Sequence, residues 1–239
     1  MKIIDGLYTL PIEVEYNGRT LPLSPVLVEL EDGIALVDTG TPQTTDQLEE
    51  AVIQAGHRLE EVRLLIFTHQ DGDHAGGGSF VYDRSRPTVC TSAVEALPIS
   101  GQTRPRGPES NSYPPVHVDI ECTGGTVFRT AAGPMEVVET PGHTPGHISL
   151  FLRDSGILIA GDALVVHKGS LAGPHPQMSE DVEMARRAVA NLAGYPVRGV
   201  LCFHGGFEET SPAALQQLSE ELLEQSQQQE EEQEGEDQA

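Results

Sequence analysis

The chain has 239 residues and a formal net charge of −23, with 37 acidic against 14 basic residues. This length fits one large α/β domain or two small ones, and it is ample for a sizeable hydrophobic core. The acidic charge opposes binding to nucleic acids and to anionic membranes, so we expect neither of those partners, but the charge does not identify a substrate.

The first sixty residues predict a group of strands followed by a helix. Residues 7–16 and 26–30 are strand-like, and a turn joins the second of them to the apolar run at 34–37, which predicts a β-hairpin. Residues 44–55 have the apolar spacing of a helix, with Thr44 and Gln47 placed as in a capping box.

The middle of the chain begins with a buried strand. Residues 62–67 are almost all apolar, as expected for a strand that is covered on both faces. A short helix is expected near Ala75, and a strand at 88–91 with a helix after it. Residues 98–115 are rich in Pro, Gly, Ser and Arg and have no period, which predicts a long loop of the kind that often carries function.

The second half repeats the alternation of strands and helices. Helices are expected at 179–193 and from Pro212 onward, where Ser211 can cap the first turn. Strands are expected at 126–129, 135–139, 148–152, 157–160 and 197–203. From residue 225 the chain is almost only Gln and Glu, so we assign residues 225–239 to a disordered acidic tail.

Together these elements predict an α/β fold in which two sheets pack face to face with helices outside. Both halves show strands followed by a helix, and polar motifs stand at the strand ends. We therefore assign residues 1–224 to a single domain.

The first cluster of chemistry-bearing residues follows the buried strand at 62–67. His69, Asp71, Asp73 and His74 lie within six residues of one another. Imidazole nitrogens and carboxylate oxygens are ordinary ligands of Zn, Fe and Mn. Carboxylates buried beside an apolar strand also require a compensating positive charge. The cluster therefore predicts a metal site rather than a polar surface loop.

Three more residues of the same ligand types recur in the same setting, each after an apolar strand and beside a glycine. Their recurrence at three further strand ends is difficult to explain as incidental surface polarity. We therefore predict that seven side chains converge on bound metal. The predicted metal ligands are His69, Asp71, Asp73, His74, His143, Asp162 and His204.

The order H-x-D-x-D-H, then His, Asp and His, resembles the metallo-β-lactamase superfamily. So do Asp38-Thr39-Gly40, TPGHTPGH at 140–147 and Ala160-Gly161-Asp162. The resemblance runs from about residue 5 to 210, and it implies an αββα sandwich of two mixed sheets with metal ions at one edge between them. It also implies the ligand sets, with Asp162 bridging two ions: His69, Asp71 and His143 for the first, and Asp73, His74 and His204 for the second.

One position departs from the usual family motif H-x-H-x-D-H, because Asp71 stands where the second His is expected. A carboxylate still binds metals, but its charge and its shorter side chain favour Mn or Fe over Zn. Flavodiiron oxidoreductases, a branch of the superfamily, also carry a carboxylate here. We expect two divalent ions, Zn²⁺ first and Fe or Mn as alternatives, or one tight and one labile ion if Asp71 weakens the first site.

The resemblance implies a hydrolase of a small-molecule ester-like bond: a thioester, lactone, β-lactam or phosphodiester. Two cations can activate a bridging hydroxide and polarise the attacked oxygen. No serine nucleophile is signposted, since the chain has no G-x-S-x-G motif. Asp73 is the candidate to orient the nucleophile and to shuttle its proton. Asp38 either fixes the tautomer of a ligand imidazole or caps a turn.

Several further polar residues lie near these motifs. His147 is expected to stabilise its turn. The loop residues are expected either to contact an anionic or polar substrate or to be solvated; they are Arg104, Arg106, His167, Lys168 and His175.

Two other functions stay open. Asp71 favours a non-haem iron oxidoreductase, either a persulfide dioxygenase or a diiron enzyme, which iron content and oxygen uptake would distinguish from a hydrolase. A metal-free binding module is the third reading, and the complete set of ligand types argues against it. The sequence does not indicate the oligomeric state.

The cysteines and the first residues indicate the cellular compartment. Cys90, Cys122 and Cys202 are far apart and form no C-x-x-C motif, so we interpret them as reduced residues of a reducing compartment. Asp5 interrupts the first apolar run, which is unlike a signal peptide. No stretch reaches the roughly 20 apolar residues of a membrane helix. We expect a cytoplasmic protein.

Overall fold

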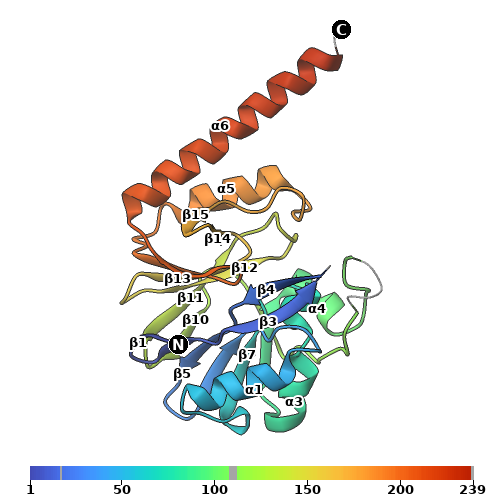
Figure 1. Cartoon of the computed structure of the whole chain (residues 1–239), viewed down its shortest axis with the longest axis vertical. Helices are drawn as coiled ribbons and strands as arrows, with labels where there is room; N and C mark the ends of the chain where they lie inside the picture. Colours follow the sequence, from blue (N-terminus) through green and yellow to red (C-terminus); the bar gives the residue numbers. More distant parts are fainter. Residues whose placement is uncertain (17, 108–111, 238–239) are drawn as a thin grey trace.

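Two mixed β-sheets lie face to face in the middle of the molecule, and helices cover their outer faces (Figure 1). The computed structural model describes residues 1–16, 18–107 and 112–237. The first sheet has seven strands in the order β1-β2-β5-β6-β7-β8-β9. In that order they span Lys2–Ile4, Leu7–Thr9, Val26–Glu29, Ile34–Val37, Val62–Ile66, Thr88–Ser92 and Ile120–Cys122.

The second sheet comes from the second half of the chain and has six strands in the order β10-β11-β12-β13-β16-β17. They span Val127–Thr130, Gly133–Glu139, Ile148–Leu152, Ile157–Gly161, Gly199–Cys202 and Gly206–Glu209. Two short antiparallel pairs lie outside these sheets: β3 (Ile12–Tyr16) with β4 (Arg19–Leu23), and β14 (Val165–His167) with β15 (Ser170–Ala172).

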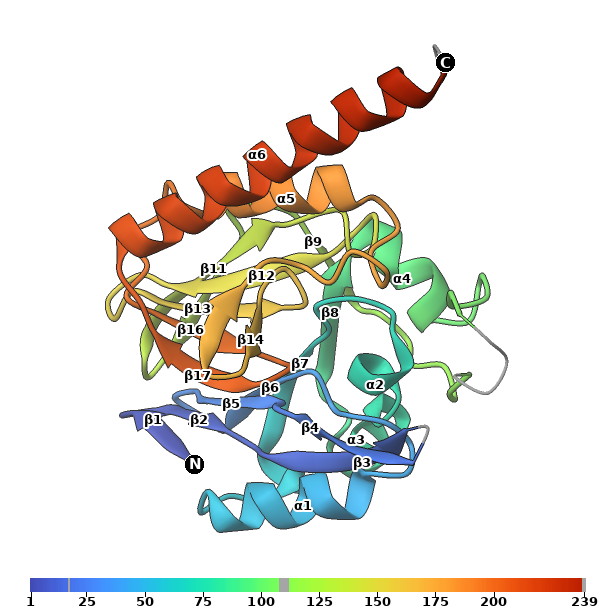
Figure 2. The same ribbon diagram turned by 45° about the horizontal axis from the view of Figure 1, so that its top comes forward.

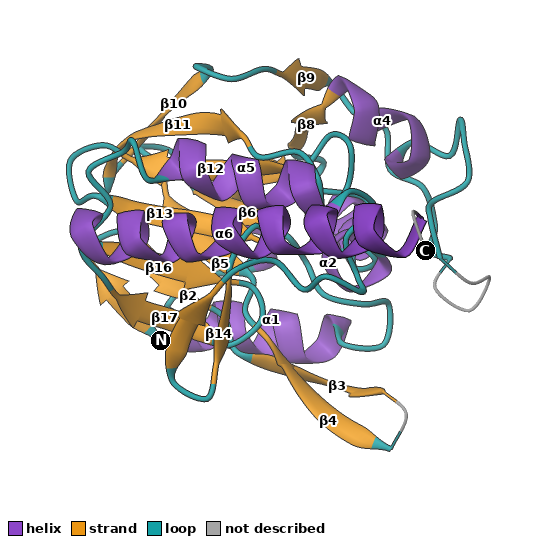
Figure 3. Ribbon diagram, turned by 90° about the horizontal axis from the view of Figure 1, so that it is seen from above, coloured by secondary structure: helices purple, strands orange, loops and turns teal. Residues whose placement is uncertain are grey.

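The helices divide between the two outer faces. On the first sheet lie α1 (Thr45–Gln54) and α3 (Gly78–Ser85). Over the second sheet α5 (Val182–Leu192) and α6 (Pro212–Asp237) run side by side, as the view from above shows (Figure 3). The shorter elements are a 3₁₀ turn at Leu59–Glu61, α2 (Gly72–Ala75) and α4 (Ala93–Ile99).

Alternation of side chains along the strands produces three apolar layers. In β6, Leu36 faces the helices α1 and α3, whereas Val37 faces the other sheet. In β12, Leu150 faces the first sheet, whereas Phe151 packs toward α5 and α6. The layers therefore succeed one another as helices, sheet, sheet and helices, and the predicted αββα sandwich is confirmed.

The helix at 44–55 is present as α1, but its predicted capping box is wrong. Thr44 makes no side-chain cap hydrogen bond. The Gln47 side chain instead accepts from the backbone N–H of Glu13 at 2.8 Å and donates to the Glu13 carbonyl at 3.0 Å. The backbone of β3 satisfies both ends of the amide, so Gln47 ties the β3–β4 pair to α1.

The C-terminal helix extends beyond the predicted start of the tail. The expectation of a disordered segment from residue 225 is not met within the described residues, because α6 continues to Asp237. Gln and Glu favour helix, and Arg186 of α5 donates a hydrogen bond to the buried Ser226 hydroxyl at 3.1 Å. Residues 238–239 of the predicted tail lie outside the described part, and the domain boundary at 224 stays a prediction.

The interpretation of three reduced cysteines is wrong for two of them. Cys90 on β8 and Cys122 on β9 form a disulfide, and Cys202 is free and buried. The two strands pair in parallel at the edge of the first sheet. The two cysteines are 32 residues apart along the chain, so the sequence alone does not indicate that they pair.

Candidate metal centre

The predicted ligands are delivered by loops that follow strands of both sheets. His69 comes just after β7, and Asp71, Asp73 and His74 lie at the start of α2, which Figure 2 labels. The remaining three follow β11, β13 and β16 and are His143, Asp162 and His204. The site therefore needs both sheets, since neither half of the chain carries all the ligands.

The side chains gather into two groups that could each hold a metal ion. His69, His143 and Asp162 offer ligand atoms that lie within 4.8 Å of one another, and so do Asp73, His74 and His204. Asp162 lies between the groups. One of its oxygens is 3.3 Å from His74 Nε2, and the other is 3.4 Å from His143 Nε2 and 3.5 Å from His204 Nε2.

Several of these ligand atoms are buried without a hydrogen-bond partner among the described residues. They include His69 Nε2, His74 Nε2 and Asp162 Oδ1. A buried polar atom without a partner costs about 1–3 kcal/mol. His74 Nε2 and Asp162 Oδ1 lie 3.3 Å apart, and all three atoms belong to side chains of the two ligand groups, so the donor set fits divalent cations.

The carboxylates of the two ligand groups stabilise positive charge between them. Burial by itself would raise the pKa of the Asp162 carboxyl, but the neighbouring histidines, led by His204, hold it well below its usual value. Burial would likewise lower the pKa of His204, but Asp162 and Asp73 raise it to about 10. The carboxylates therefore favour protons or metal ions at this position.

Two residues outside the ligand groups fix the orientation of the ligands. Asp38, with a backbone φ of +60°, places its carboxylate 2.8 Å from His74 Nδ1 and accepts from the Thr68 backbone N–H and hydroxyl. Of the two roles expected for Asp38, this arrangement favours orientation of a ligand imidazole, because it leaves His74 Nε2 to face Asp162. His147 is structural, as expected: its Nε2 accepts from the Asp162 backbone N–H at 3.0 Å.

Asp71 lies beside the two groups and is held by an arginine from the long loop. Its carboxylate is 3.4 Å from His69 Nε2 and 3.2 Å from His143 Nε2. Arg106 forms a bidentate pair with it, of which the Nε–Oδ1 contact measures 2.6 Å. Burial would raise the pKa of Asp71, but the Arg106 hydrogen bonds and the two histidines lower it far below its usual value. The described part of the predicted loop at 98–115 therefore reaches the centre through Arg106.

Glu95 is a residue that the sequence interpretation missed. It is fully buried on α4, and its carboxylate accepts from the backbone N–H of Gln70 at 2.9 Å and of Gly146 at 2.8 Å. These two backbone groups belong to the loops that carry His69 and His143. The S-x-x-E spacing from Ser92 marks a helix start, but nothing in the sequence indicates that this carboxylate joins two ligand loops.

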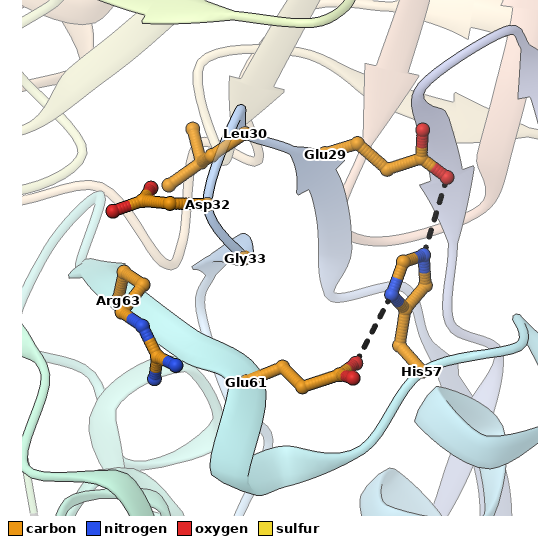
Figure 4. A pocket seen from close by; sticks show the side chains of 7 residues that line it. All are labelled: Glu29, Leu30, Asp32, Gly33, His57, Glu61 and Arg63. Atoms are coloured by element: carbon orange, nitrogen blue, oxygen red, sulfur yellow. Dashed lines mark hydrogen bonds and ion pairs between the residues drawn. The ribbon is translucent and has the colours of Figure 1, made fainter.

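A surface pocket lies away from this centre. Its volume is about 450 Å³, and it lies where β5 ends and β7 begins. Figure 4 shows the residues that line it. His57 lies there between Glu29 at 3.2 Å and Glu61 at 3.3 Å. These contacts join the segment after α1 to β5 and to the 3₁₀ turn, so His57 is a bridging residue.

Comparison with known proteins agrees with this geometry. The chain matches the family model of the metallo-beta-lactamase superfamily over residues 19–217. Probable metallo-hydrolase YflN of Bacillus subtilis (strain 168) is 28% identical over 196 residues, which cover 71% of this chain and 74% of that protein. Hydroxyacylglutathione hydrolase of Chelativorans sp. (strain BNC1) is 30% identical over 129 residues, which cover 53% of this chain and 44% of that protein.

Solved structures share the fold. A metallo-beta-lactamase family protein of Thermus thermophilus matches with a TM-score of 0.75 and 25% identity, covering 95% of this chain and 81% of that one. A subclass B3 metallo-beta-lactamase of Bradyrhizobium japonicum matches with a TM-score of 0.73 at 17% identity, covering 98% and 94%. Because the family model spans most of the residues that build the two sheets and all seven predicted ligands, this chain is an enzyme of the metallo-beta-lactamase superfamily, a family of metallo-hydrolases.

Proposed function

We propose that this metallo-hydrolase cleaves an ester-like bond of a small molecule: a thioester, lactone, β-lactam or phosphodiester. The observation that carries the proposal is the position of Asp162, whose two oxygens face the histidines of two ligand groups. When bound, a divalent metal would supply a Lewis acid that polarises the attacked oxygen and acidifies a water molecule.

The residues around the metal site orient the ligands and the attacking water. Asp38 and Thr68 orient the His74 ring, and His147 holds the backbone that carries Asp162. Asp73 has the most accessible carboxylate of the centre, with 33% of its side chain exposed against 11% for Asp162. Asp73 is thus the proposed group that orients the attacking water and accepts its proton.

Zinc is the proposed metal, with Fe or Mn as alternatives. Four imidazole nitrogens serve the centre, and imidazole suits zinc well. The extra negative charge of Asp71, which favours harder cations, is balanced by the Arg106 guanidinium. The same ion pair weakens the argument for an iron oxidoreductase, because that argument depends on a free carboxylate at Asp71.

The substrate panel begins with thioesters. A relative named hydroxyacylglutathione hydrolase aligns with about half of this chain, which supports a thioester without establishing one. The full chain would be tested with a thioester, a lactone, nitrocefin and an activated phosphodiester, and its metals would be measured by elemental analysis. We expect zinc and turnover of at least one of these substrates. Stoichiometric iron with oxygen uptake and no hydrolysis would contradict the proposal.

The cellular location stays a prediction. None of the described helices is both long and apolar enough to cross a membrane. The sequence predicts a cytoplasmic enzyme, but the Cys90–Cys122 disulfide is more typical of oxidising compartments. Titration of thiols in freshly prepared cell extract distinguishes the two locations.

A further inference from the structure

Every N–H of the Arg106 side chain has an acceptor within the protein. A guanidinium carries five N–H donors in a fixed plane and no acceptor. Nε and one Nη2 hydrogen bind the two oxygens of Asp71. The others bind the backbone carbonyls of His143 at 2.8 Å and Met178 at 3.0 Å, and His143 Nε2 at 2.8 Å.

Because all five N–H groups are hydrogen-bonded within the protein, Arg106 in this arrangement has no donor left to bind an anionic substrate. Its side chain is only 20% exposed, and each donor that would bind a carboxylate or phosphate is already committed. The contacts instead point into the ligand cluster. Arg106 is therefore part of the centre itself, and the loop at 98–115 brings a permanent positive charge to it.

The contact with His143 decides what that charge does. His143 Nε2 is the ring nitrogen that faces Asp162 at 3.4 Å and Asp71 at 3.2 Å, so it is the atom that a metal in the first group would need. Since a guanidinium only donates, the bond from Arg106 uses the lone pair of that nitrogen, which assigns the ring proton to Nδ1 and makes the 3.2 Å approach to Asp71 a contact and not a donated hydrogen bond. A divalent cation there would lose this ligand and would also be repelled by the guanidinium charge.

The second group has no such competitor among the described residues. The contacts of Arg106 reach Asp71, His143, Met178 and, more distantly, Glu180. His74 Nε2 and Asp162 Oδ1 face each other at 3.3 Å, and neither has a hydrogen-bond partner within the described ranges. This pair, with Asp73 and His204, can bind a cation that replaces only the contacts of His204 Nε2 with Asp73 at 3.3 Å and Asp162 at 3.5 Å.

The geometry points to Arg106 as the resident cation of the first ligand group, so that the chain holds a single tight metal ion, bound by Asp73, His74, His204 and Asp162. Asp71 and Arg106 then act as a charge-balanced unit in place of the first metal. This inference rests on the proposed metal-binding role of the cluster, and of the two metal contents that the sequence left open it favours one tight ion, with Arg106 as the cause.

Metal titration of the full chain tests the inference without measuring turnover. Metal-stripped wild-type protein would be titrated with Zn²⁺ by calorimetry, and the bound zinc would be counted by elemental analysis after gel filtration. We expect one tight equivalent. In Arg106→Gln the ligands of the first group no longer bind the guanidinium. A second zinc equivalent should then bind about 10–100-fold more tightly than it does to the wild type, a change of the size typical when a partner of a metal ligand is altered.

The matched control is Arg104→Gln, which removes an exposed arginine from the same loop and should bind zinc like the wild type. Two zinc equivalents of equal affinity in the wild-type protein would overturn the inference and leave the proposed function intact. An Arg106→Gln variant that folds and still binds only one zinc ion would have the same consequence. The wild-type titration decides the matter even if Arg106→Gln fails to fold. Wild-type protein that binds no zinc, manganese or iron would instead overturn the proposed function.

Discussion

At the scale of single residues, Asp162 is the side chain whose carboxylate lies close to histidines of both ligand groups. Its oxygens lie 3.3–3.5 Å from three histidine nitrogens, and its backbone N–H is fixed by His147. Replacement of this carboxylate removes the only negative group that faces both groups among the seven predicted ligands. Loss of Asp162 should therefore affect metal binding and catalysis together.

We expect Asp162→Asn to lower zinc affinity by at least about 100-fold, at the upper end of the effect of changing a partner of a ligand, and to abolish turnover. Elemental analysis and the substrate assay measure both. Asp83→Asn is the matched control, because Asp83 is exposed and pairs only at the surface with Arg86. An Asp162→Asn protein that keeps full metal content and activity would contradict the ligand assignment.

The cysteines provide a second test at this scale. Burial raises the pKa of the Cys202 thiol well above its usual value, so the thiol stays neutral and unreactive near pH 8. We expect no maleimide label in the folded protein, one label per chain after denaturation without reductant, and three with reductant. Labelling of the folded protein, or three labels without reductant, would contradict this assignment.

The sequence predicts the ligand types and their order well but not the contacts between distant loops. The six residues from His69 to His74 form a local motif, and the glycine-flanked His143, Asp162 and His204 repeat its setting. Arg106 lies 35 residues from Asp71, in a loop with no period, so no pattern indicates their pairing. Whether the seven residues bind metal stays a proposal.

At the scale of elements, the turn before His143 depends on Gly142 packing against α5. Gly142 has a φ of +132°, and a Cβ added there would lie 2.1 Å from the backbone nitrogen of Ala185. A methyl group at this place must therefore move either the His143 loop or the start of α5. The loop is the element that carries a predicted metal ligand.

We expect Gly142→Ala to lower the free energy of unfolding by roughly 2–5 kcal/mol, from overpacking and backbone strain together. Gly56→Ala is the matched control. Gly56 also has a positive φ, of +91°, but has open space around it, so only a backbone cost of about 1–2 kcal/mol applies. Urea denaturation compares the two, and equal losses would show that the contact with α5 is unimportant.

Helix α6 provides the second prediction at this scale. Leu215 and Leu222 bury one face of it, and Ser226 receives a hydrogen bond from Arg186. Truncation after Gln228 should change the melting temperature by no more than about 2 °C and leave metal content unaltered. Truncation after Ser219 removes the buried Leu222 and should lower the melting temperature by roughly 5 °C. Equal melting temperatures for both truncations would contradict the docking of this helix.

The elements that sequence predicts best are those with a clear period. Strand β7 is apolar except for Arg63 and α1 has helical spacing, so both are found close to their predicted ends. The extension of α6 was missed because its charge argues for disorder, whereas its helix propensity and the Arg186 anchor act in the opposite direction. The short pair β14–β15 has too few residues to show a period.

At the scale of the whole molecule, the centre exists only where the two sheets meet. The first half provides His69, Asp71, Asp73 and His74, and the second half provides His143, Asp162 and His204. Arg106 arrives from the connection between the halves. The formal charge of −23 adds a field that attracts divalent cations and repels anionic macromolecules, in agreement with the expected small-molecule substrate.

The central claim is that hydrolysis depends on metal held at this junction, and removal of the metal tests it most directly. The initial rate on the best substrate of the panel would be measured for the full chain as purified, after chelator treatment and dialysis, and after stoichiometric Zn²⁺ is returned. We predict loss of activity on removal and recovery when the zinc is restored. Chelator-treated protein that contains no metal and retains its full rate would contradict the claim.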